Sequence, residues 1–303
     1  MSDPFAHPSS DKLLGSFFDL FQYERIFQRK DRHIVFLCGG PVKAKSRSMR
    51  YRFLKFSKYR LPNFRLFLAE SATKDLTQHG EPEFVNLADF ESVIGEIADC
   101  IVIFVESPGS IAELGFFVHN PKTLKKLLVV NDMNRQKKDS FINVGLVDKI
   151  NSKSLFKPVI LTRVKDPDFS FVEQRLESRL PVKTGKRFEH KKFSKLTPRE
   201  RLFVVFQTIF VMRALRFDSV KYCINRVFGY ANEKKLRHLL SILIAIEYVE
   251  RKGESPEYFV PRKKAEPFLD FRNYDMNRMH AAVADYFREH HRETYNILGE
   301  VAN

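Results

Sequence analysis

The sequence has no tryptophan, only three cysteines among its 303 residues, and no apolar run of the roughly 18 residues that a membrane-spanning helix needs. Its N-terminus also lacks the basic start and apolar stretch of a secretion signal. Cys38, Cys100 and Cys223 lie far apart within apolar stretches, which indicates reduced core thiols and neither a disulfide framework nor a metal site. We therefore expect a soluble, cytoplasmic protein with no membrane association, no metal and no cofactor.

Positive charge is in excess and unevenly distributed. The formal net charge is +15 at pH 7, which favours a polyanionic partner. Residues 32–69 contain no acidic residue, whereas residues 75–121 contain no Lys or Arg. Each segment is compatible with a solvated face. The basic stretch 43–65 suits a phosphate-bearing substrate and a nucleic acid equally well, and the acidic segment draws attention to carboxylates beside strand ends.

The first half of the chain has the pattern of an α/β domain. A length of 303 residues predicts about two domains. A segment over 1–30, with an amphipathic helix at 11–29, precedes a domain over 31–180 in which apolar strands alternate with helices. That alternation predicts a parallel sheet flanked by helices, as in Rossmann-like folds. The predicted strands are 33–38, 65–69, 100–105 and 126–130, and the predicted helices are 87–98 and 110–118.

The second half changes class after a basic linker at 181–198. Three helical patterns follow, at 199–214, 219–227 and 232–246, with Asn232 placed to cap the third. Two strands around a Gly/Ser/Pro turn come next, from 247 onward. This order predicts a winged-helix domain over 199–303, ending in a helix at 275–299. From 183 to 303 the chain has 24 Lys and Arg against 15 Asp and Glu, which favours nucleic-acid contact, although a small helical domain with a basic polar face would look the same.

Two corners of the α/β domain are candidates for ligand contact. In a parallel sheet, ligands bind where the carboxyl ends of strands meet helix N-termini, because backbone N–H groups and the helix dipole are presented there. One corner contains the pair Gly39-Gly40, and pairs of glycines also occur in simple tight turns. The candidate substrate-binding residues at the two corners are Cys38, Gly39, Gly40, Ser107, Gly109 and Ser110.

Glu113 is the strongest candidate for chemistry. It lies about one turn into the helix that begins at Ser-Pro-Gly-Ser, so its carboxylate can point back over the strand ends. A carboxylate in this position can attack the anomeric carbon of a glycoside as the base leaves, forming a glycosyl-enzyme ester that water or another base resolves. The same position also suits a Glu that only stabilises the helix dipole, worth about 0.3–1 kcal/mol.

Three motifs in order resemble one family. FLCGG at 36–40, FVESPGSIAELG at 104–115 and SFINVG at 140–145 make residues 34–145 similar to the nucleoside 2-deoxyribosyltransferase-like domain of bacterial retron effector proteins. The resemblance implies that Glu113 is the nucleophile and that Asn143 contacts substrate. Members of the wider family place Asp residues in the supporting loops, whereas this chain offers Glu70 and Glu106, which we take as further catalytic candidates.

The resemblance also implies a biological role and partners. It implies a toxin of an anti-phage defence system, active in abortive infection, that is restrained by a retron reverse transcriptase and its multicopy single-stranded DNA (msDNA). NAD is the first substrate choice and a nucleoside or nucleotide the second, and assembly into a homo-oligomer is compatible with the family. The alternative is a nucleotide-sensing winged-helix regulator without chemistry. The predicted nucleic-acid contacts lie on the third helix and the wing, at Lys234, Lys235, Arg237, His238, Arg251, Lys252, Arg262, Lys263 and Lys264.

Overall fold

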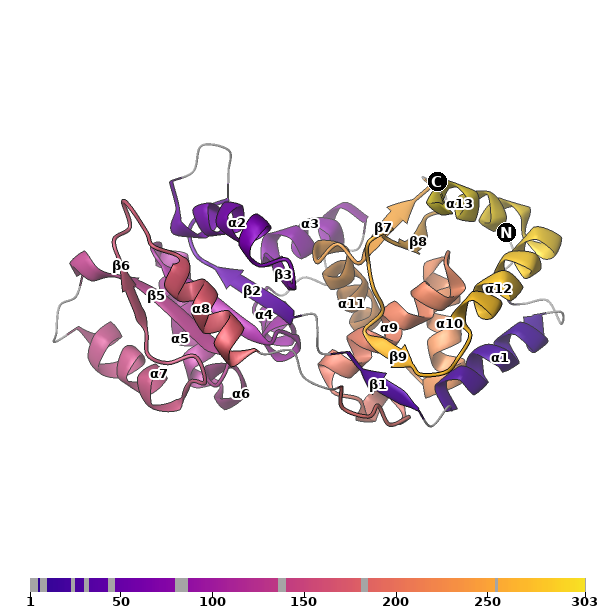
Figure 1. Cartoon of the computed structure of the whole chain (residues 1–303), viewed down its shortest axis with the longest axis horizontal. Coiled ribbons are helices and arrows are strands. Elements are labelled where there is room, and N and C mark those ends of the chain that lie inside the picture. The colour runs from indigo at the N-terminus through magenta and orange to yellow at the C-terminus, as the bar shows by residue number, and fades with distance from the viewer. Residues whose placement is uncertain are drawn as a thin grey trace. The chain divides into compact units, whose positions relative to one another are not determined.

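The chain forms two compact units in the computed structural model (Figure 1). The structure describes residues 5, 10–22, 25–29, 33–42, 47–79, 87–135, 140–180, 185–253 and 256–302. One unit, called the α/β unit here, comprises 31–71 and 87–183, and the other, the helical unit, comprises 1–30, 72–86 and 184–303. Within the described ranges, none of the helices combines the length and apolarity that crossing a membrane requires.

A five-stranded parallel sheet organises the α/β unit. All neighbouring strands are parallel, which confirms the predicted α/β class with a parallel sheet flanked by helices. The central strands are six residues long and buried throughout, so their sequences are continuous apolar runs. In spatial order the strands are β3 (Phe64–Phe67), β2 (His33–Cys38), β4 (Cys100–Val105), β5 (Leu127–Asp132) and β6 (Ile160–Thr162).

Helices cover both faces of this sheet. Alternate strand residues such as Leu37 and Phe104 pack against α2 (Met49–Arg60) and α8 (Ser170–Arg179). The other face meets α4 (Leu87–Ile97) and α5 (Pro108–His119), where Phe36 of β2 contacts Phe117 of α5. The remaining elements that belong to this unit are α6 (Pro121–Leu124), η2 (Met133–Arg135), η3 (Ile142–Val147) and α7 (Asp148–Lys153).

Helix α3 (Ala69–His79) begins in the α/β unit and continues into residues that cluster with the helical unit. Residues 72–86, which lie inside the domain predicted over 31–180, cluster with the helical unit, and the α/β unit extends to 183. Because parallel strands share one direction, the ends of β2, β4 and β5 meet at one edge of the sheet. The two predicted substrate-binding corners, which follow β2 and β4, lie at this edge.

The helical unit contains the predicted order of three helices and a hairpin. Helix α9 (Pro198–Met212) is almost entirely buried and is followed by α10 (Phe217–Phe228) and α11 (Glu233–Ala245). Asn232 caps α11 as predicted, because its side-chain oxygen accepts a hydrogen bond from the backbone N–H of Lys235 at 3.1 Å. Strands β7 (Val249–Lys252) and β8 (Tyr258–Pro261) form an antiparallel hairpin. Membership of the winged-helix class stays a prediction.

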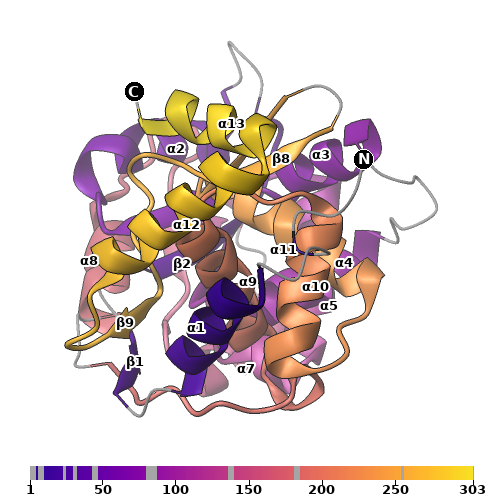
Figure 2. The ribbon, with the colours of Figure 1, turned by 90° about the vertical axis from the view of Figure 1, so that its right-hand side faces the viewer.

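The outer parts of this unit differ from the sequence-based expectation. The predicted helix 11–29 is wrong at its end, because α1 (Ser10–Gln22) stops early and β1 (Ile26–Gln28) pairs with β9 (Leu269–Phe271). The predicted helix 275–299 is two helices, α12 (Met276–His290) and α13 (Arg292–Ala302), separated at His291. Helix α12 packs against α1 and α13 (Figure 2). Within the segment predicted as a linker, the described residues 185–198 bury Phe188, Phe193 and Leu196 and include η4 (Phe193–Lys195).

Candidate active site

Helix α5 starts immediately after β4 because two serines cap each other. The Ser107 hydroxyl accepts a hydrogen bond from the backbone N–H of Ser110 at 3.2 Å, and the Ser110 hydroxyl accepts one from the N–H of Ser107 at 2.9 Å. Pro108 occupies the first turn, where its missing N–H has no cost. This start places Glu106 at the end of the strand and Glu113 on the helix that follows.

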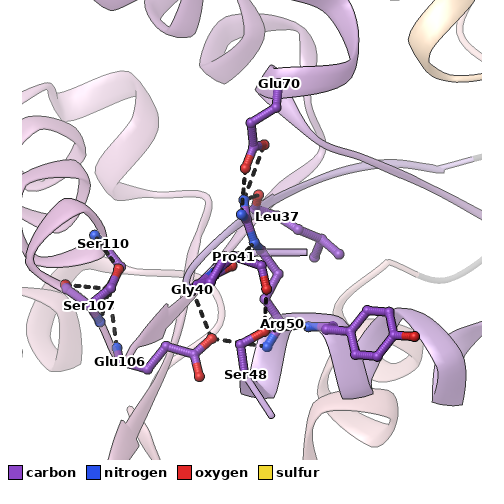
Figure 3. Close-up of polar contacts among 10 residues, drawn as sticks. Leu37, Gly40, Pro41, Ser48, Arg50, Glu70, Glu106, Ser107 and Ser110 are labelled. Atoms are coloured by element: carbon purple, nitrogen blue, oxygen red, sulfur yellow. Dashed lines mark hydrogen bonds and ion pairs between the residues drawn. The ribbon is translucent and has the colours of Figure 1, made fainter. Parts of the chain in front are cut away.

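Glu106 holds the start of helix α2. Its carboxylate accepts backbone hydrogen bonds from Gly40 at 2.9 Å and Arg50 at 3.1 Å (Figure 3), and a third from Met49 at 2.5 Å. Both carboxylate oxygens are therefore committed to backbone donors. The sequence predicted a catalytic role for Glu106, but these contacts favour a supporting role that fixes the Gly40 loop against α2.

Arg50 lies beneath this corner and was not predicted as part of the site. Its side chain is only 5% exposed, and its Nε donates to the carbonyl oxygen of Gly40 at 2.7 Å. Its Nη1 and Nη2 donate to the two carboxylate oxygens of Glu70 at 3.2 and 2.5 Å (Figure 3). A buried guanidinium needs such a partner, because an unpaired charge away from water is strongly unfavourable. Glu70 thus supports Arg50 at the edge of the site.

Glu113 has the environment expected of a reactive carboxylate. Its Oε2 is buried and has no hydrogen-bonding partner among the residues that the structure describes. Burial raises the pKa of Glu113 to about 7, with further contributions from the charge of Glu91, upward, and of Arg50, downward. The thiol of Cys38 donates a hydrogen bond to the carboxylate, which also lowers its pKa. A carboxylate that titrates near neutral pH is typical of catalytic sites.

Glu91 is a second residue that the sequence did not single out. It lies on α4, and burial followed by the charge of Glu70 raises its pKa. Glu70, Glu91 and Glu113 come from three consecutive helices and influence one another electrostatically. Only long-range packing brings them together, so spacing along the chain carried no signal. The cluster favours a protonated carboxyl group near neutral pH, since like charges disfavour full ionisation.

A cavity of about 590 Å³ lies at the ends of β4 and β5. Its polar groups are mostly amides and hydroxyls. Of the predicted substrate-binding residues, Ser107 and Asn143 line the cavity, whereas Glu113 does not contribute to its wall. The thiol of Cys38 is buried and faces Glu113, so it does not reach the cavity. The cavity is lined by Val105, Glu106, Ser107, Pro108, Ile111, Asn131, Asn134, Ser140, Ile142 and Asn143.

The contact between Cys38 and Glu113 predicts a specific pH dependence. If ionised Glu113 is the nucleophile, kcat/KM should rise about tenfold per pH unit below pH 6 and level off above a midpoint near the pKa of about 7. Cys38→Ala removes the hydrogen bond that lowers this pKa, so the midpoint should move to higher pH. Cys100→Ala, at an equally buried cysteine on β4, should leave the midpoint unchanged. A midpoint near 4.5 in the unaltered protein would contradict the assignment.

The predicted nucleic-acid contacts separate into internal and accessible groups. Arg251 is committed inside the helical unit, because it pairs with Asp75 at 3.0 Å and with Glu257 at 2.6 Å and is only 18% exposed. His238 is buried at 6% exposure. Arg237 pairs with Glu233 and stacks over Phe217. The structure therefore does not present Arg251 or His238 as phosphate contacts.

The accessible group lies at the start of α11 and after the hairpin. Lys235 and Lys263 are exposed, and Lys234 is half-buried in the first turn of α11. Lys264 is exposed, whereas Lys252 and Arg262 form long ion pairs with Glu250 at 3.7 and 3.5 Å. In the described ranges, no three His, Cys, Asp or Glu side chains are arranged to hold a metal ion.

The site and fold define a class. It is an α/β protein with a partly buried carboxyl group whose pKa is about 7, and with a cavity, lined in part by Asn side chains, at the carboxyl edge of a parallel sheet. The family described as STM3845 retron effector protein matches residues 46–251, which is more than half of the sequence. The chain belongs to this retron effector family, as the three motifs indicated.

Two Escherichia coli proteins are similar to the chain. The retron Ec73 putative ribosyltransferase/DNA-binding protein is 28% identical over 239 residues, which cover 72% of this chain and 74% of that protein. The retron Ec86 putative ribosyltransferase/DNA-binding protein is 36% identical over 126 residues, which cover 41% of this chain and 40% of that protein. Both names describe a putative ribosyltransferase/DNA-binding protein.

Proposed function

We propose that the protein cleaves N-glycosidic bonds of NAD, or of nucleosides or nucleotides, with Glu113 as the nucleophile. The ionised carboxylate attacks the anomeric carbon, and the carbon–nitrogen bond breaks with its electron pair leaving on the base. Water then adds to the anomeric carbon and releases Glu113, so the net reaction consumes one water and yields free sugar and base. If a second base takes the place of water, the same intermediate gives transfer.

One observation carries this proposal: the partly buried Glu113, whose Oε2 has no partner among the described residues and whose pKa is raised to about 7. A Glu that only stabilised the dipole of α5 would be expected to lie in contact with water and to ionise at its ordinary pKa. The family membership and the ribosyltransferase names of the two relatives support a glycosyl-transfer role. Glu106 and Glu70 are assigned to positioning, since their oxygens bind the start of α2 and Arg50.

The charge of the site favours NAD as the first substrate to test. Glu70 pairs with the buried guanidinium of Arg50, and the charges of Glu70 and Glu91 both act on Glu113. An acidic surrounding attracts the cationic nicotinamide ring of NAD and disfavours approach of anions. Nicotinamide also leaves as a neutral molecule without needing a proton. A neutral base would need one, and Glu91, with its raised pKa, is the nearest candidate donor.

The reaction is tested by incubating the purified protein with NAD and a panel of nucleosides and nucleotides and measuring released base by chromatography. We expect nicotinamide release from NAD. Release of a different base would keep the glycosyl-transfer chemistry and change the substrate. If no member of the panel releases a base while nucleotides bind, the alternative of a non-catalytic nucleotide sensor is favoured.

We further propose that the helical unit binds the retron nucleic acid. Membership of the retron effector family and the DNA-binding names of the relatives support this role, as does the basic start of α11. In this proposal, the effector is a toxin that a complex of reverse transcriptase and msDNA restrains until infection.

The nucleic-acid contact predicts a measurable salt dependence. Replacing both Lys234 and Lys235 by Ala should weaken binding of the msDNA and reduce the slope of log K against log salt by about two, since each phosphate contact contributes about 0.9. The measurement is fluorescence anisotropy between 50 and 200 mM salt. Over this interval, a change of about two in the slope alters the salt-induced loss of affinity by about tenfold. Lys149→Ala with Lys153→Ala on α7 makes the same charge change in the α/β unit and is the control. An unchanged slope would remove α11 from the interface.

A further inference from the structure

The β2–α2 corner is a cradle of three backbone donors filled by the protein's own carboxylate. The N–H groups of Gly40, Met49 and Arg50 converge on Glu106 at 2.9, 2.5 and 3.1 Å; the bonds from Gly40 and Arg50 are drawn in Figure 3. Two of these donors belong to the first turn of α2, a helix of 12 residues, and the third comes from the glycine loop. In α/β proteins, this combination of a glycine loop and a helix N-terminus binds phosphate.

The glycines are explained by the approach of Glu106. A Cβ on Gly39 would lie 3.0 Å from the Cβ of Arg50 and 3.1 Å from Oε1 of Glu106, and a Cβ on Gly40 would lie 2.9 Å from the Cβ of Ser48 and 3.1 Å from Oε1 of Glu106. Gly39 also has a φ of 154°, a conformation that L side chains rarely adopt. The loop is therefore shaped around an anion, and that anion is the side chain of Glu106.

The neighbouring helix start is closed in a similar way. At the beginning of α5, the hydroxyl of Ser110 accepts hydrogen bonds from the N–H groups of Glu106 and Ser107, and the hydroxyl of Ser107 accepts one from the N–H of Ser110. The adjacent cavity instead presents the uncharged polar side chains of Asn131 and Asn143, among others. Both helix starts at this edge thus bond to the protein's own side chains, and the adjacent cavity offers a ligand amide, hydroxyl and apolar side chains together with Glu106.

We propose that Glu106 is a specificity-determining residue: it occupies the position where an α/β protein would bind substrate phosphate, so this edge admits the sugar and base of the substrate and excludes its phosphate groups from the β2–α2 corner. This inference rests on the proposed function only in taking this edge as the place where the substrate binds. A substrate that contains a diphosphate then binds with this group located away from the glycine loop.

The test is whether removing the carboxylate creates a phosphate site. Glu106→Ala opens the cradle, whereas Glu106→Gln keeps it filled with an uncharged group of the same shape. Thermal unfolding of the full chain is measured in inorganic phosphate and in chloride at equal ionic strength. We expect phosphate at about ten times its dissociation constant to raise the Tm of Glu106→Ala by about 3 °C, and further increases to follow the logarithm of the phosphate concentration. The unaltered protein and Glu106→Gln should show no such rise.

Each outcome decides the proposal. If Glu106→Ala folds only when phosphate is added, the cradle is a phosphate site in the absence of Glu106. The inference is overturned if phosphate raises the Tm of the unaltered protein as much as that of Glu106→Ala. It is also overturned if the rise in Tm is no greater in Glu106→Ala than in Glu106→Gln. The measurement involves no catalysis, so its result does not depend on the proposed function. The proposed function is tested separately by the loss of glycosidase activity in Glu113→Gln, and that result would not change the effect of phosphate on the Tm.

Discussion

Glu113→Gln is expected to lower the rate of base release by at least about 10³-fold, since it removes the nucleophile while keeping the shape of the side chain. Toxicity in cells should be lost with it, and binding of the msDNA should be retained. The measurement is the rate of nicotinamide or base release at pH 8, where Glu113 of the unaltered protein is ionised. Glu177→Gln, at an exposed position of α8, makes the same chemical change and should retain full activity.

The same variant should be at least as stable as the unaltered protein at high pH. The folded pKa of Glu113, about 7, lies above its ordinary value of 4.5, so the native state holds its proton more tightly than the unfolded chain. Stability is therefore lost as pH rises from 4.5 through 7, because ionising the buried group is unfavourable. Gln has no charge to bury, so the Tm advantage of Glu113→Gln should grow over this interval. A variant that is both inactive and less stable at pH 8 would indicate a structural role instead.

Asp75→Ala is expected to destabilise the helical unit by about 3–5 kcal/mol, the cost of breaking a buried ion pair on one side. Asp75 is 8% exposed, and its carboxylate accepts hydrogen bonds from Ser241 at 2.8 Å and from Nε and Nη2 of Arg251 at 3.0 Å each. Removing it leaves a buried hydroxyl and a guanidinium that retains only its pair with Glu257. Urea unfolding followed by circular dichroism gives the free energy of unfolding.

A double-mutant cycle separates this pair from other effects. Asp75→Ala combined with Arg251→Met should cost about 2 kcal/mol less than the sum of the single changes, because the second change removes the unpaired charge. Glu250→Ala is the control, since its ion pairs with Lys252 and Arg262 are long and half-exposed, and exposed pairs contribute about 0–1 kcal/mol. If Asp75→Ala costs no more than Glu250→Ala, the pair does not hold the hairpin to α3.

Local patterns predicted what local forces determine. Strands β2 and β4 were predicted with the bounds that the structure has, because strands buried on both faces are continuous apolar runs. The capping of α11 by Asn232 was also predicted, since this capping residue lies three positions from its partner Lys235. By contrast, β1 was predicted as helix, and its partner β9 lies more than two hundred residues away.

The candidate site divides in the same way. Glu113 could be proposed from its motif, and Glu70 and Glu106 from the family resemblance, as the carboxylates that this chain offers where family members place Asp. Arg50 was missed because a basic helix predicts a solvated face, and only the fold supplies Glu70 and the carbonyl of Gly40 as its buried partners. Arg251 was misjudged for the same reason, as its partner Asp75 is 176 positions away. Charges acquire their roles from distant partners, which one sequence does not display.

The most direct test of the central claim is to detect the covalent intermediate on Glu113. The protein would be incubated with NAD or the active substrate of the panel, using a sugar analogue fluorinated beside the anomeric carbon to slow release of the ester, and peptides would be mapped by mass spectrometry. We predict a glycosyl mass increase on the peptide that contains Glu113, absent in Glu113→Gln. Base release with no adduct on that peptide, or an adduct on another residue, would contradict the account.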